Sequence, residues 1–322
     1  MSVIDCSLIS VIIPTFNRAK TVCAAIDSVL AQTYRRMEII VVDDGSTDDT
    51  DGLLRRYEEK IRIIRQSNAG PAAARNAGAR NAKGELLAFL DSDDVWKPER
   101  LRLQMEALAC AGESVNCAVC DVELHEVNGK GGTSFGRAWL SPQLPSGIWL
   151  NPMEVLITRF LFFNQAALIR RTAFGRMGGF DERLRFLEDY DLALRAAQLS
   201  PWAFVAEPLV IWRQGADSLS REALEKKRLL KECECGIRSG FCQRVGKPQP
   251  RGKLGRLMEQ QLRRAEREFQ IELLSEAVTP WKLLAAAALR EVERLRSAVF
   301  RRSPCYPGMH EVSFAQFTAY YL

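Results

Sequence analysis

The sequence predicts an α/β fold with a mixed, mostly parallel sheet flanked by helices over residues 1–220, followed by a basic, mostly helical extension over residues 221–322. Three observations lead to this expectation. Short apolar runs alternate with longer amphipathic stretches over the first 95 residues, polar or acidic residues follow the apolar runs, and positive charge is concentrated towards the C-terminus.

Four apolar runs predict buried strands, at residues 8–13, 37–42, 61–64 and 86–90. Residues 18–30 have the apolar periodicity of a helix, and residues 71–82 predict a helix rich in small residues. Pro14 is expected to end the first strand, Asn17 to cap the first helix, and the helix after the second strand to end near Lys60. Further along the chain, a glycine-rich stretch predicts a surface loop between residues 129 and 147.

The charge of the chain is unevenly distributed. Residues 221–322 contain 20 Lys and Arg and 12 Asp and Glu, a net charge of +8, which leaves −3 for residues 1–220. This basic segment favours an anionic partner, either a membrane surface that carries acidic lipids or a nucleic acid. A solvated helical surface with no such partner explains the charge equally well. Apolar residues at helical spacing between Trp281 and Val299 fit packing on the main domain or binding to a membrane surface.

The sequence predicts a cytoplasmic protein that is at most peripheral on the inner face of the cytoplasmic membrane. No apolar run approaches the roughly 20 residues that span a bilayer, and the first residues lack a signal-peptide pattern. The nine cysteines suggest no disulfide framework. Cys117 and Cys120 have the spacing of half a zinc site but lie in an apolar run, which favours buried strand thiols over zinc.

The acidic cluster Asp91-Ser92-Asp93-Asp94 follows the apolar run at residues 86–90. Clustered carboxylates repel one another unless a cation shares them, and Mg²⁺ is typically held by one or two carboxylates plus substrate phosphates. Asp94 has an alternative role as a cap of the helix that follows Pro98. The cluster therefore predicts a site for a divalent metal and a nucleotide diphosphate.

Other polar segments are expected to lie near this cluster. Thr15 and Asp43-Asp44 follow predicted strands, and the carboxyl ends of parallel strands meet at one edge of a sheet. Arg75 lies one turn into a predicted helix, where a guanidinium and free backbone amides suit a phosphate. Glu188 and Asp189 begin a later helix, where the helix dipole alone could favour acidic residues.

Five of these segments, taken in order, resemble the family 2 glycosyltransferases of the GT-A fold. They are VIIPTFN at 11–17, VDDGSTD at 42–48, ARN at 74–76, LDSDD at 90–94 and ED at 188–189. The resemblance covers about the first 215 residues. It implies a Rossmann-like GT-A domain and an inverting, metal-dependent enzyme. This enzyme would transfer sugar from a nucleotide-diphosphate sugar to a hydroxyl of a lipid-linked or polysaccharide acceptor, and nucleic acid is not an expected partner.

The resemblance also implies roles for individual residues. Those expected to bind the nucleotide sugar are Thr15, Asn17, Asp44, Arg75, Asp91, Ser92 and Asp93. Asp91 and Asp93 are expected to ligate Mg²⁺ or Mn²⁺. Asp189 is expected to take the proton of the acceptor hydroxyl as catalytic base, with Glu188 orienting the acceptor or the base. Residues 160–171, including Asn164 and Gln165, resemble the strand beneath the acceptor site.

The sequence departs from the family pattern at Gln214, where many relatives have a histidine that would offer a third metal ligand. The neighbouring Arg213 is a candidate to pair with diphosphate oxygens. The Gln-x-x-Arg-Trp element and flanking membrane helices of processive polysaccharide synthases are absent from the sequence, which favours transfer of a single sugar.

Two alternatives to a glycosyltransferase remain open at this point. A nucleotidyltransferase that makes nucleotide sugars would share the metal, the nucleotide and a related sheet. That class usually has a glycine-rich loop and an activating lysine after the first strand, where this chain has Pro14-Thr15-Phe16-Asn17-Arg18. A non-catalytic module that binds a nucleotide or an anionic surface would not need a carboxylate in the position expected for Asp189.

Overall fold

The computed structural model describes residues 7–126, 129–156, 159, 161, 164–184, 186–214, 237, 260 and 263. The predicted basic extension therefore lies outside the described residues apart from Ile237, Gln260 and Arg263. Its apolar stretch between Trp281 and Val299 lies outside them entirely.

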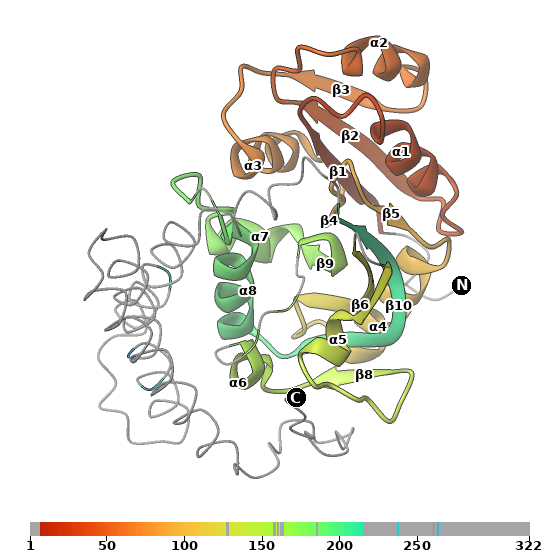
Figure 1. The fold of residues 1–322 in the computed structure, drawn as a ribbon. Coiled ribbons are helices and arrows are strands. Elements are labelled where there is room, and N and C mark those ends of the chain that lie inside the picture. The colour runs from red at the N-terminus through yellow and green to blue at the C-terminus, as the bar shows by residue number, and fades with distance from the viewer. Residues whose placement is uncertain are drawn as a thin grey trace, which may run out of the picture. The chain divides into compact units, whose positions relative to one another are not determined.

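A ten-stranded sheet forms the centre of the described domain (Figure 1). Its strands are β1 Ile9–Thr15, β2 Met37–Asp43, β3 Arg62–Arg65, β4 Leu86–Phe89, β5 Val95–Trp96, β6 Cys117–Glu126, β7 Gly129–Thr133, β8 Ser146–Trp149, β9 Ala167–Arg170 and β10 Trp202–Arg213. They run in the order β3-β2-β1-β4-β9-β6-β10-β5, with β7 on β6 and β8 on β10. The strands β1 to β4, β6 and β10 share one direction, which confirms the predicted mixed, mostly parallel sheet.

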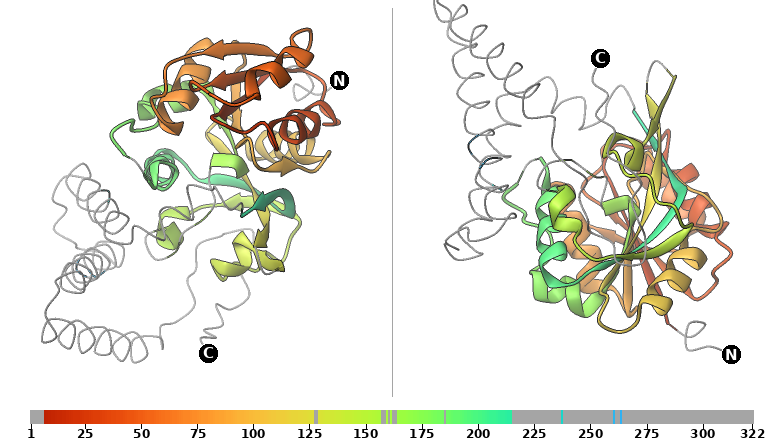
Figure 2. Two further views of the ribbon diagram at one scale, coloured as in Figure 1. Left: turned by 45° about the horizontal axis from the view of Figure 1, so that its top comes forward. Right: turned by 90° about the horizontal axis from the view of Figure 1, so that it is seen from below.

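Helices cover both faces of this sheet (Figures 1 and 2). They are α1 Val22–Leu30, α2 Thr50–Leu54, α3 Pro71–Asn81, α4 Arg100–Ala111, α5 Ser134–Arg137, α6 Pro152–Leu156, α7 Arg171–Met177 and α8 Glu188–Leu199, with short 3-10 turns η2 Arg55–Tyr57 and η3 Asn164–Ala166. The helices α1 and α4 bury their apolar residues against one face of the sheet, while α3 and α7 lie on the other.

The strand β1 is buried along its whole length because it is covered on both faces. Ile9, Val11 and Ile13 join the core beneath α1, while Ile12 faces α3. At Gly78 of α3, an added Cβ would lie 2.4 Å from Ile12 Cγ2. The absence of a side chain at Gly78 thus allows α3 to approach the sheet closely, which brings Arg75 of the same helix towards the ends of the strands.

The sequence predicted that Pro14 ends the first strand. This prediction is wrong, because β1 continues to Thr15. The carbonyl of Ile12 accepts a hydrogen bond from Leu90 N on the β4 side, and alternate residues of a strand face the same neighbour. Pro14 therefore faces the β4 side too, beyond the last paired residues Ile12 and Phe89. The missing N–H of proline falls where no ladder hydrogen bond is needed.

Two predicted helices have different bounds. The first begins at Val22 instead of Arg18, and no side chain caps its first turn. The second ends at Leu54, is continued only by the turn η2, and does not reach Lys60. Gly52 lies inside this short helix, where glycine lowers helix stability. The backbone N–H groups of Lys60 and Ile61 both donate to the carbonyl of Tyr57, so the chain turns there into β3.

The predicted surface loop between residues 129 and 147 is also wrong in part, because β7 and α5 form there and β8 begins at Ser146. The strand β7 pairs antiparallel with the end of β6. Phe135 and Leu140 are buried, and Phe135 N donates to Asp121 Oδ1 at 2.7 Å. Two buried apolar side chains and this buried hydrogen bond anchor a segment whose glycine content suggested a loop.

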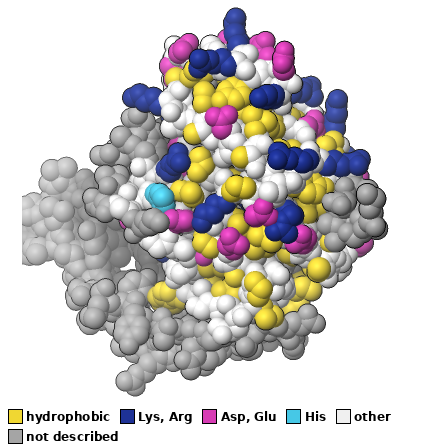
Figure 3. Space-filling view, turned by 90° about the vertical axis from the view of Figure 1, so that its right-hand side faces the viewer, with side chains coloured by type: hydrophobic (Ala, Val, Ile, Leu, Met, Phe, Trp, Pro, Cys, Tyr) yellow, Lys and Arg dark blue, Asp and Glu magenta, His cyan; other side chains and the backbone are white. Residues whose placement is uncertain are grey.

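The surface of the described domain carries both signs of charge. On the face shown in Figure 3, Lys and Arg side chains lie among Asp and Glu side chains, with hydrophobic side chains between them. This mixture agrees with the small net charge of residues 1–220. Within the described ranges, no helix combines the length and the apolar content needed to cross a membrane.

Candidate active site

The predicted polar residues meet at the carboxyl edge of the parallel strands. Asp44 N donates to the carbonyl of Thr15 at 2.8 Å, so the ends of β1 and β2 lie side by side. Leu90 N donates to the carbonyl of Ile12 at 3.0 Å, which places Asp91 at the same edge. Thr15 Oγ1 is buried and has no hydrogen-bond partner in the described part of the chain.

Asn17 organises the loop after β2 and does not cap α1. Its φ angle is +52°, a left-handed conformation that asparagine tolerates better than most residues. Its Oδ1 accepts from Thr47 N at 2.8 Å and from Asp48 N at 3.3 Å, while its own N donates to Ser46 Oγ at 3.0 Å. The predicted cap was wrong because the asparagine side chain satisfies backbone donors of another loop.

Asp44 fixes the segment that leads from β3 into α3. Its Oδ1 accepts from Gln66 Nε2 at 2.7 Å and from Ala69 N at 2.9 Å, and its Oδ2 accepts from Gly70 N at 2.8 Å. The residue is buried. In the described part of the chain, this expected nucleotide ligand thus contacts the protein itself, and its contacts set the start of the helix that carries Arg75.

Arg75 joins segments that are far apart in the sequence. Its Nη2 lies 2.6 Å from Asp91 Oδ1, and its Nη1 lies 2.7 Å from Glu188 Oε1. The guanidinium is also 5.3 Å from the centre of the Phe180 ring. Burial lowers the pKa of Arg75, but the charges of Asp91 and Glu188 outweigh it and raise the pKa above its usual value. One buried cation therefore connects the acidic cluster to the first residue of α8.

The acidic cluster has a partly exposed half formed by Asp91 and Asp93. Asp91 Oδ2 lies 3.3 Å from Asn164 Nδ2, and Asp93 Oδ2 lies 3.5 Å from Arg18 Nε. Burial and the charge of Asp91 raise the pKa of Asp93, although Arg18 opposes this effect. Ser92 lies between them and is buried. The two aspartates form a negatively charged pair that a cation would neutralise.

Asp94 does not cap the next helix, which begins at Arg100 after a different residue, Glu99. Its Oδ1 accepts from Arg213 N at 2.8 Å, and its Oδ2 lies 3.3 Å from Gln165 Nε2. Burial and then the charges of Asp93 and Asp91 raise its pKa well above the usual value. Asp94 thus joins the end of β10 to the acidic cluster, a role that helix-capping rules did not predict.

Asp189 lies in the first turn of α8, next to Glu188. Its Oδ1 accepts from Tyr190 N at 2.8 Å. Burial and the charge of Glu188 raise the pKa of Asp189 to about 7, with a smaller contribution from Asp91, whereas Arg75 lowers it. A carboxylate that is half ionised near neutral pH is suited to accept a proton from a hydroxyl group.

If Asp189 acts as a catalytic base, the reaction rate should depend on pH through its carboxyl group. Because a base must be deprotonated, kcat/KM should rise by about tenfold per pH unit below pH 7 and level off above it. The charged groups that act on this carboxyl are Glu188, Arg75 and Asp91. Initial rates measured between about pH 5 and pH 9 would show whether kcat/KM rises or falls with pH. A rate that falls with rising pH across this range would contradict a basic role.

The region expected to lie beneath the acceptor is organised differently from the prediction. Within residues 160–171 the strand β9 begins only at Ala167, and Asn164 and Gln165 lie in the turn η3 before it. Phe160, Phe162 and Phe163 lie outside the described residues. The contacts of Asn164 with Asp91 and of Gln165 with Asp94 show that η3 supports the acidic cluster.

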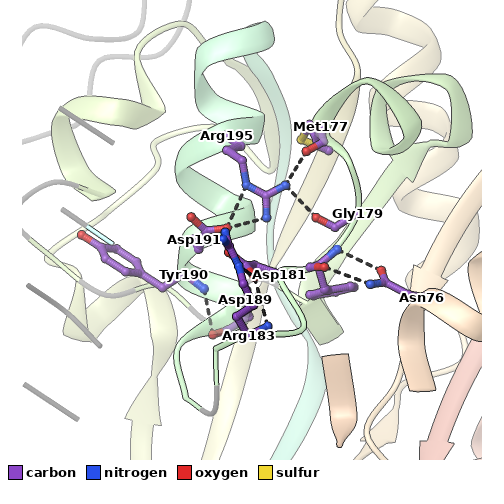
Figure 4. A network of polar contacts seen from close by, with 10 residues as sticks. Asn76, Met177, Gly179, Asp181, Arg183, Asp189, Tyr190, Asp191 and Arg195 are labelled. Atoms are coloured by element: carbon purple, nitrogen blue, oxygen red, sulfur yellow. Dashed lines mark hydrogen bonds and ion pairs between the residues drawn. The ribbon is translucent and has the colours of Figure 1, made fainter. Parts of the chain in front are cut away.

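Three further residues at the site received no role from the sequence. Phe16 follows β1 and is 41% exposed. Asn76 and Arg195 contact residues 177–180, which form the turn before α8. Figure 4 shows this turn together with Asp189. Asn76 lies within the ARN segment, and Arg195 is spaced four residues from Asp191 on a helix, a known ion-pair spacing. These signals were present in the sequence, but the partners on the turn were not evident.

The sequence offered two candidate cation sites, the acidic cluster and the pair Cys117 and Cys120. Among the residues that the structure describes, no group of three or more His, Cys, Asp or Glu side chains could hold a metal ion. Cys117 and Cys120 are buried, free thiols of β6, as the apolar run predicted. Burial raises the pKa of Cys120 to about 11, so it is a thiol at neutral pH. The pair Asp91 and Asp93 remains as the candidate for a site completed by substrate phosphates.

Residues 10–184 match the family model described as glycosyl transferase family 2. The chain belongs to this family. An uncharacterised glycosyltransferase of Rickettsia prowazekii (strain Madrid E) is 33% identical over 241 residues, or 74% of this chain and 73% of the relative. The succinoglycan biosynthesis protein ExoO of Rhizobium meliloti is 34% identical over 193 residues, or 58% of this chain and 55% of the relative.

Solved structures of low sequence identity share the fold. Residues 1–349 of S. aureus TarS in complex with UDP-GlcNAc superpose with a TM-score of 0.64 at 19% identity, over 86% of this chain and 79% of that chain. The mannosyltransferase PcManGT from Pyrobaculum calidifontis, in complex with GDP-Man and Mn²⁺, gives 0.54 at 21% identity over 90% and 80%. The GT-A-type fold predicted from the sequence is confirmed.

Membership of the family also decides between the functional alternatives. The chain is a glycosyltransferase, as the ordered motifs predicted, and neither a nucleotidyltransferase nor a non-catalytic binding module.

Proposed function

We propose that this glycosyltransferase transfers a single sugar, with inversion, from a nucleotide-diphosphate sugar to a hydroxyl group of a glycan or lipid-linked acceptor. The observation that carries the proposal is the double contact of Arg75 with Asp91 and Glu188, at 2.6 and 2.7 Å. It links the segment expected to bind the donor with the helix that carries Asp189. Donor and base would then act within one connected site.

The donor would lie along the carboxyl edge of β1, β2 and β4. Thr15 offers a buried hydroxyl with no described partner, and Phe16 offers an exposed aromatic ring on which a base can stack. Asn17, Asp44 and Ser92 would shape the site, since the first two hold its loops. The structural relatives were solved with UDP-GlcNAc and with GDP-Man, which supports a nucleotide-diphosphate donor here.

A divalent metal, Mg²⁺ or Mn²⁺, suits the residues of the acidic cluster. Asp91 and Asp93 are 26% and 24% exposed, and the charge of Asp91 contributes to the raised pKa of Asp93 although Arg75 and Arg18 lie nearby. Two carboxylates suffice where substrate phosphates supply further oxygens. A third protein ligand in place of Gln214 is therefore not needed. A metal bound there would stabilise the negative charge of the leaving nucleotide diphosphate. The Mn²⁺ in the mannosyltransferase structure supports this assignment.

Asp189 would serve as the base of the transfer. Its carboxylate would take the proton of the acceptor hydroxyl while that oxygen forms a bond to the anomeric carbon of the donor. The bond from this carbon to the diphosphate oxygen breaks with its electron pair leaving on the diphosphate. Attack on the face opposite the leaving group inverts the anomeric configuration. Glu188, held by Arg75, would orient the base or the acceptor.

The class of acceptor follows from the relatives and remains a prediction. ExoO acts in succinoglycan biosynthesis by its name, which supports an acceptor in the assembly of a polysaccharide. The net positive charge of residues 221–322 supports an acceptor at an anionic membrane surface. Arg213, whose N–H binds Asp94, stays a candidate contact for the diphosphate.

A donor screen tests the proposed function directly. The full chain with MnCl₂ would be incubated with UDP- and GDP-sugars, and thermal shift would identify donors that stabilise the folded protein. Transfer to membrane-extracted and polysaccharide acceptors would then be followed with the donor of largest shift, and the anomeric configuration of the product determined by NMR. Stabilisation by none of the donors would contradict the proposal, and a retained configuration would contradict inversion.

Substituting Asp93→Ala is expected to weaken Mn²⁺-dependent binding of the nucleoside diphosphate by at least about tenfold, because even outer-shell changes weaken metal sites by roughly 10- to 100-fold. Calorimetric titrations of UDP and GDP with and without MnCl₂ would measure this change. Asp51→Ala provides a control, since Asp51 pairs with Arg55 and Arg65 at the surface. An unchanged Mn²⁺ dependence in Asp93→Ala would exclude Asp93 as a ligand.

A further inference from the structure

The turn that precedes α8 is held to α3 by the side chain of Asn76 (Figure 4). Asn76 Nδ2 donates to the carbonyl of Phe180 at 2.9 Å and to Glu182 Oε1 at 2.8 Å. Phe180 N donates in return to Asn76 Oδ1 at 2.9 Å. Asn76 is only 8% exposed, so little water can replace these bonds. The amide thus holds both backbone polar groups of Phe180.

The same turn is held to α8 by Arg195 (Figure 4). Its Nη1 donates to the carbonyls of Met177 and Gly179, both at 2.6 Å. Its Nε donates to Asp191 Oδ2 at 2.8 Å, and Asp191 is buried. Arg195 therefore attaches residues 177–180 to α8, and Asn76 attaches the same residues to α3.

Side-chain packing of Phe180 connects the turn at residues 177–180 to the acidic cluster. The Phe180 ring meets the Phe89 ring edge-on, with 5.1 Å between their centres, and Phe89 is the last residue of β4. The guanidinium of Arg75 lies near the same Phe180 ring and binds Asp91. A shift of Phe180 would thus change the distance between α8 and the segment that begins at Asp91.

Gly179 shows how closely the turn fits against Asn76. A Cβ added at this residue would lie 2.6 Å from Asn76 Oδ1, much closer than van der Waals contact allows. The φ angle of +75° also disfavours any side chain there. The contact between Asn76 and the turn therefore depends on glycine at this position.

We propose that Asn76 is a positioning residue of sugar transfer, which sets the place of Glu188 and Asp189 relative to the donor site through the turn at residues 177–180. The inference rests on the proposed role of Asp189 as base. Misplacement of a reacting group by about 1 Å can lower a rate by about 10²-fold. The side chain of Asn76 binds Phe180 and Glu182 and not the acidic cluster, so its loss should affect the reaction step and not donor binding.

The test compares Asn76→Ala with Asn81→Ala in the full chain. Asn81 lies on the same helix but donates to the carbonyl of Ala77 and accepts from Arg62, away from the turn. We expect kcat of Asn76→Ala to fall by roughly 10- to 100-fold with an unchanged KM for the donor. Asn81→Ala should keep the wild-type kcat. A purely stabilising role would lower the melting temperature without this division between kcat and KM.

Gly179→Ala provides a second test, which also serves if Asn76→Ala does not fold. The new methyl group would displace Asn76 Oδ1, so kcat should fall as in Asn76→Ala, and the double variant should be no slower than the slower single one. A folded Asn76→Ala or Gly179→Ala with wild-type kcat, or with the loss confined to donor KM, would overturn the inference alone. A wild-type protein that transfers no sugar would overturn the proposed function as well.

Discussion

Asp189→Asn is expected to lower kcat by about 10²- to 10⁴-fold, the range that a positioned base contributes to proton transfer. The amide keeps the size of the side chain but has no basic oxygen at neutral pH. Donor binding should stay close to the wild-type value, because Asp189 lies on α8 and not at the edge of β1, β2 and β4. Steady-state kinetics with the donor found by screening, together with calorimetry of donor binding, would measure both quantities.

Asp181→Asn is a matched control for this change. Asp181 precedes the same helix and pairs with Arg183, whose side chain is 87% exposed. Since surface ion pairs contribute little, this variant should retain wild-type kcat and stability within experimental error. Comparable turnover in wild type and Asp189→Asn would show that another group takes the proton.

Arg75→Met is expected to affect stability and catalysis together. It would leave the carboxylates of Asp91 and Glu188 without their shared buried cation, and breaking such a contact costs about 3 kcal/mol or more. The loss of Arg75 would also remove the charge that lowers the pKa of Asp189. The ascending limb of the pH profile should therefore move to higher pH. Urea unfolding and kcat/KM between about pH 6 and pH 9 would report these two effects separately.

The double variant Arg75→Met, Glu188→Gln distinguishes lost charge pairing from lost packing. Removing the charge of Glu188 should restore part of the stability, because Asp91 retains its contact with Asn164. It should also return the pH profile towards that of the wild type, since Glu188 is the strongest charge that raises the pKa of Asp189. Equal stabilities of the single and double variants would instead point to lost packing against Phe180.

The sequence predicted the sheet and the edge of the site because both depend on local patterns. Apolar runs identified β1 to β4, and the parallel arrangement then brought Thr15 and Asp91 to one edge. The beginning of α8 was predicted in the same way, from acidic residues ahead of an amphipathic stretch. These features need only short windows of sequence, in which strand and helix periodicity are distinct.

Errors arose where a side chain reaches a distant segment. Asn17 and Asp94 both precede helical patterns and therefore resembled helix caps. Asn17 binds backbone N–H groups 30 and 31 residues away, and Asp94 binds one 119 residues away. The contact of Arg75 with Glu188 spans 113 residues. A single sequence contains no signal for the pairing partner in such cases, because the partner is set by the packing of the sheet and its helices.

The consecutive residues Arg75 and Asn76 on α3 have a consequence for hybrid enzymes. A chimera that takes residues 1–170 from this chain and the turn with α8 from a relative would combine an α3 and a turn that were not selected together. Arg75 would need a carboxylate at the position of Glu188, and Asn76 would need glycine at the position of Gly179. We therefore expect active hybrids only between relatives that share this pair of contacts, or when α3 is transferred together with the C-terminal half.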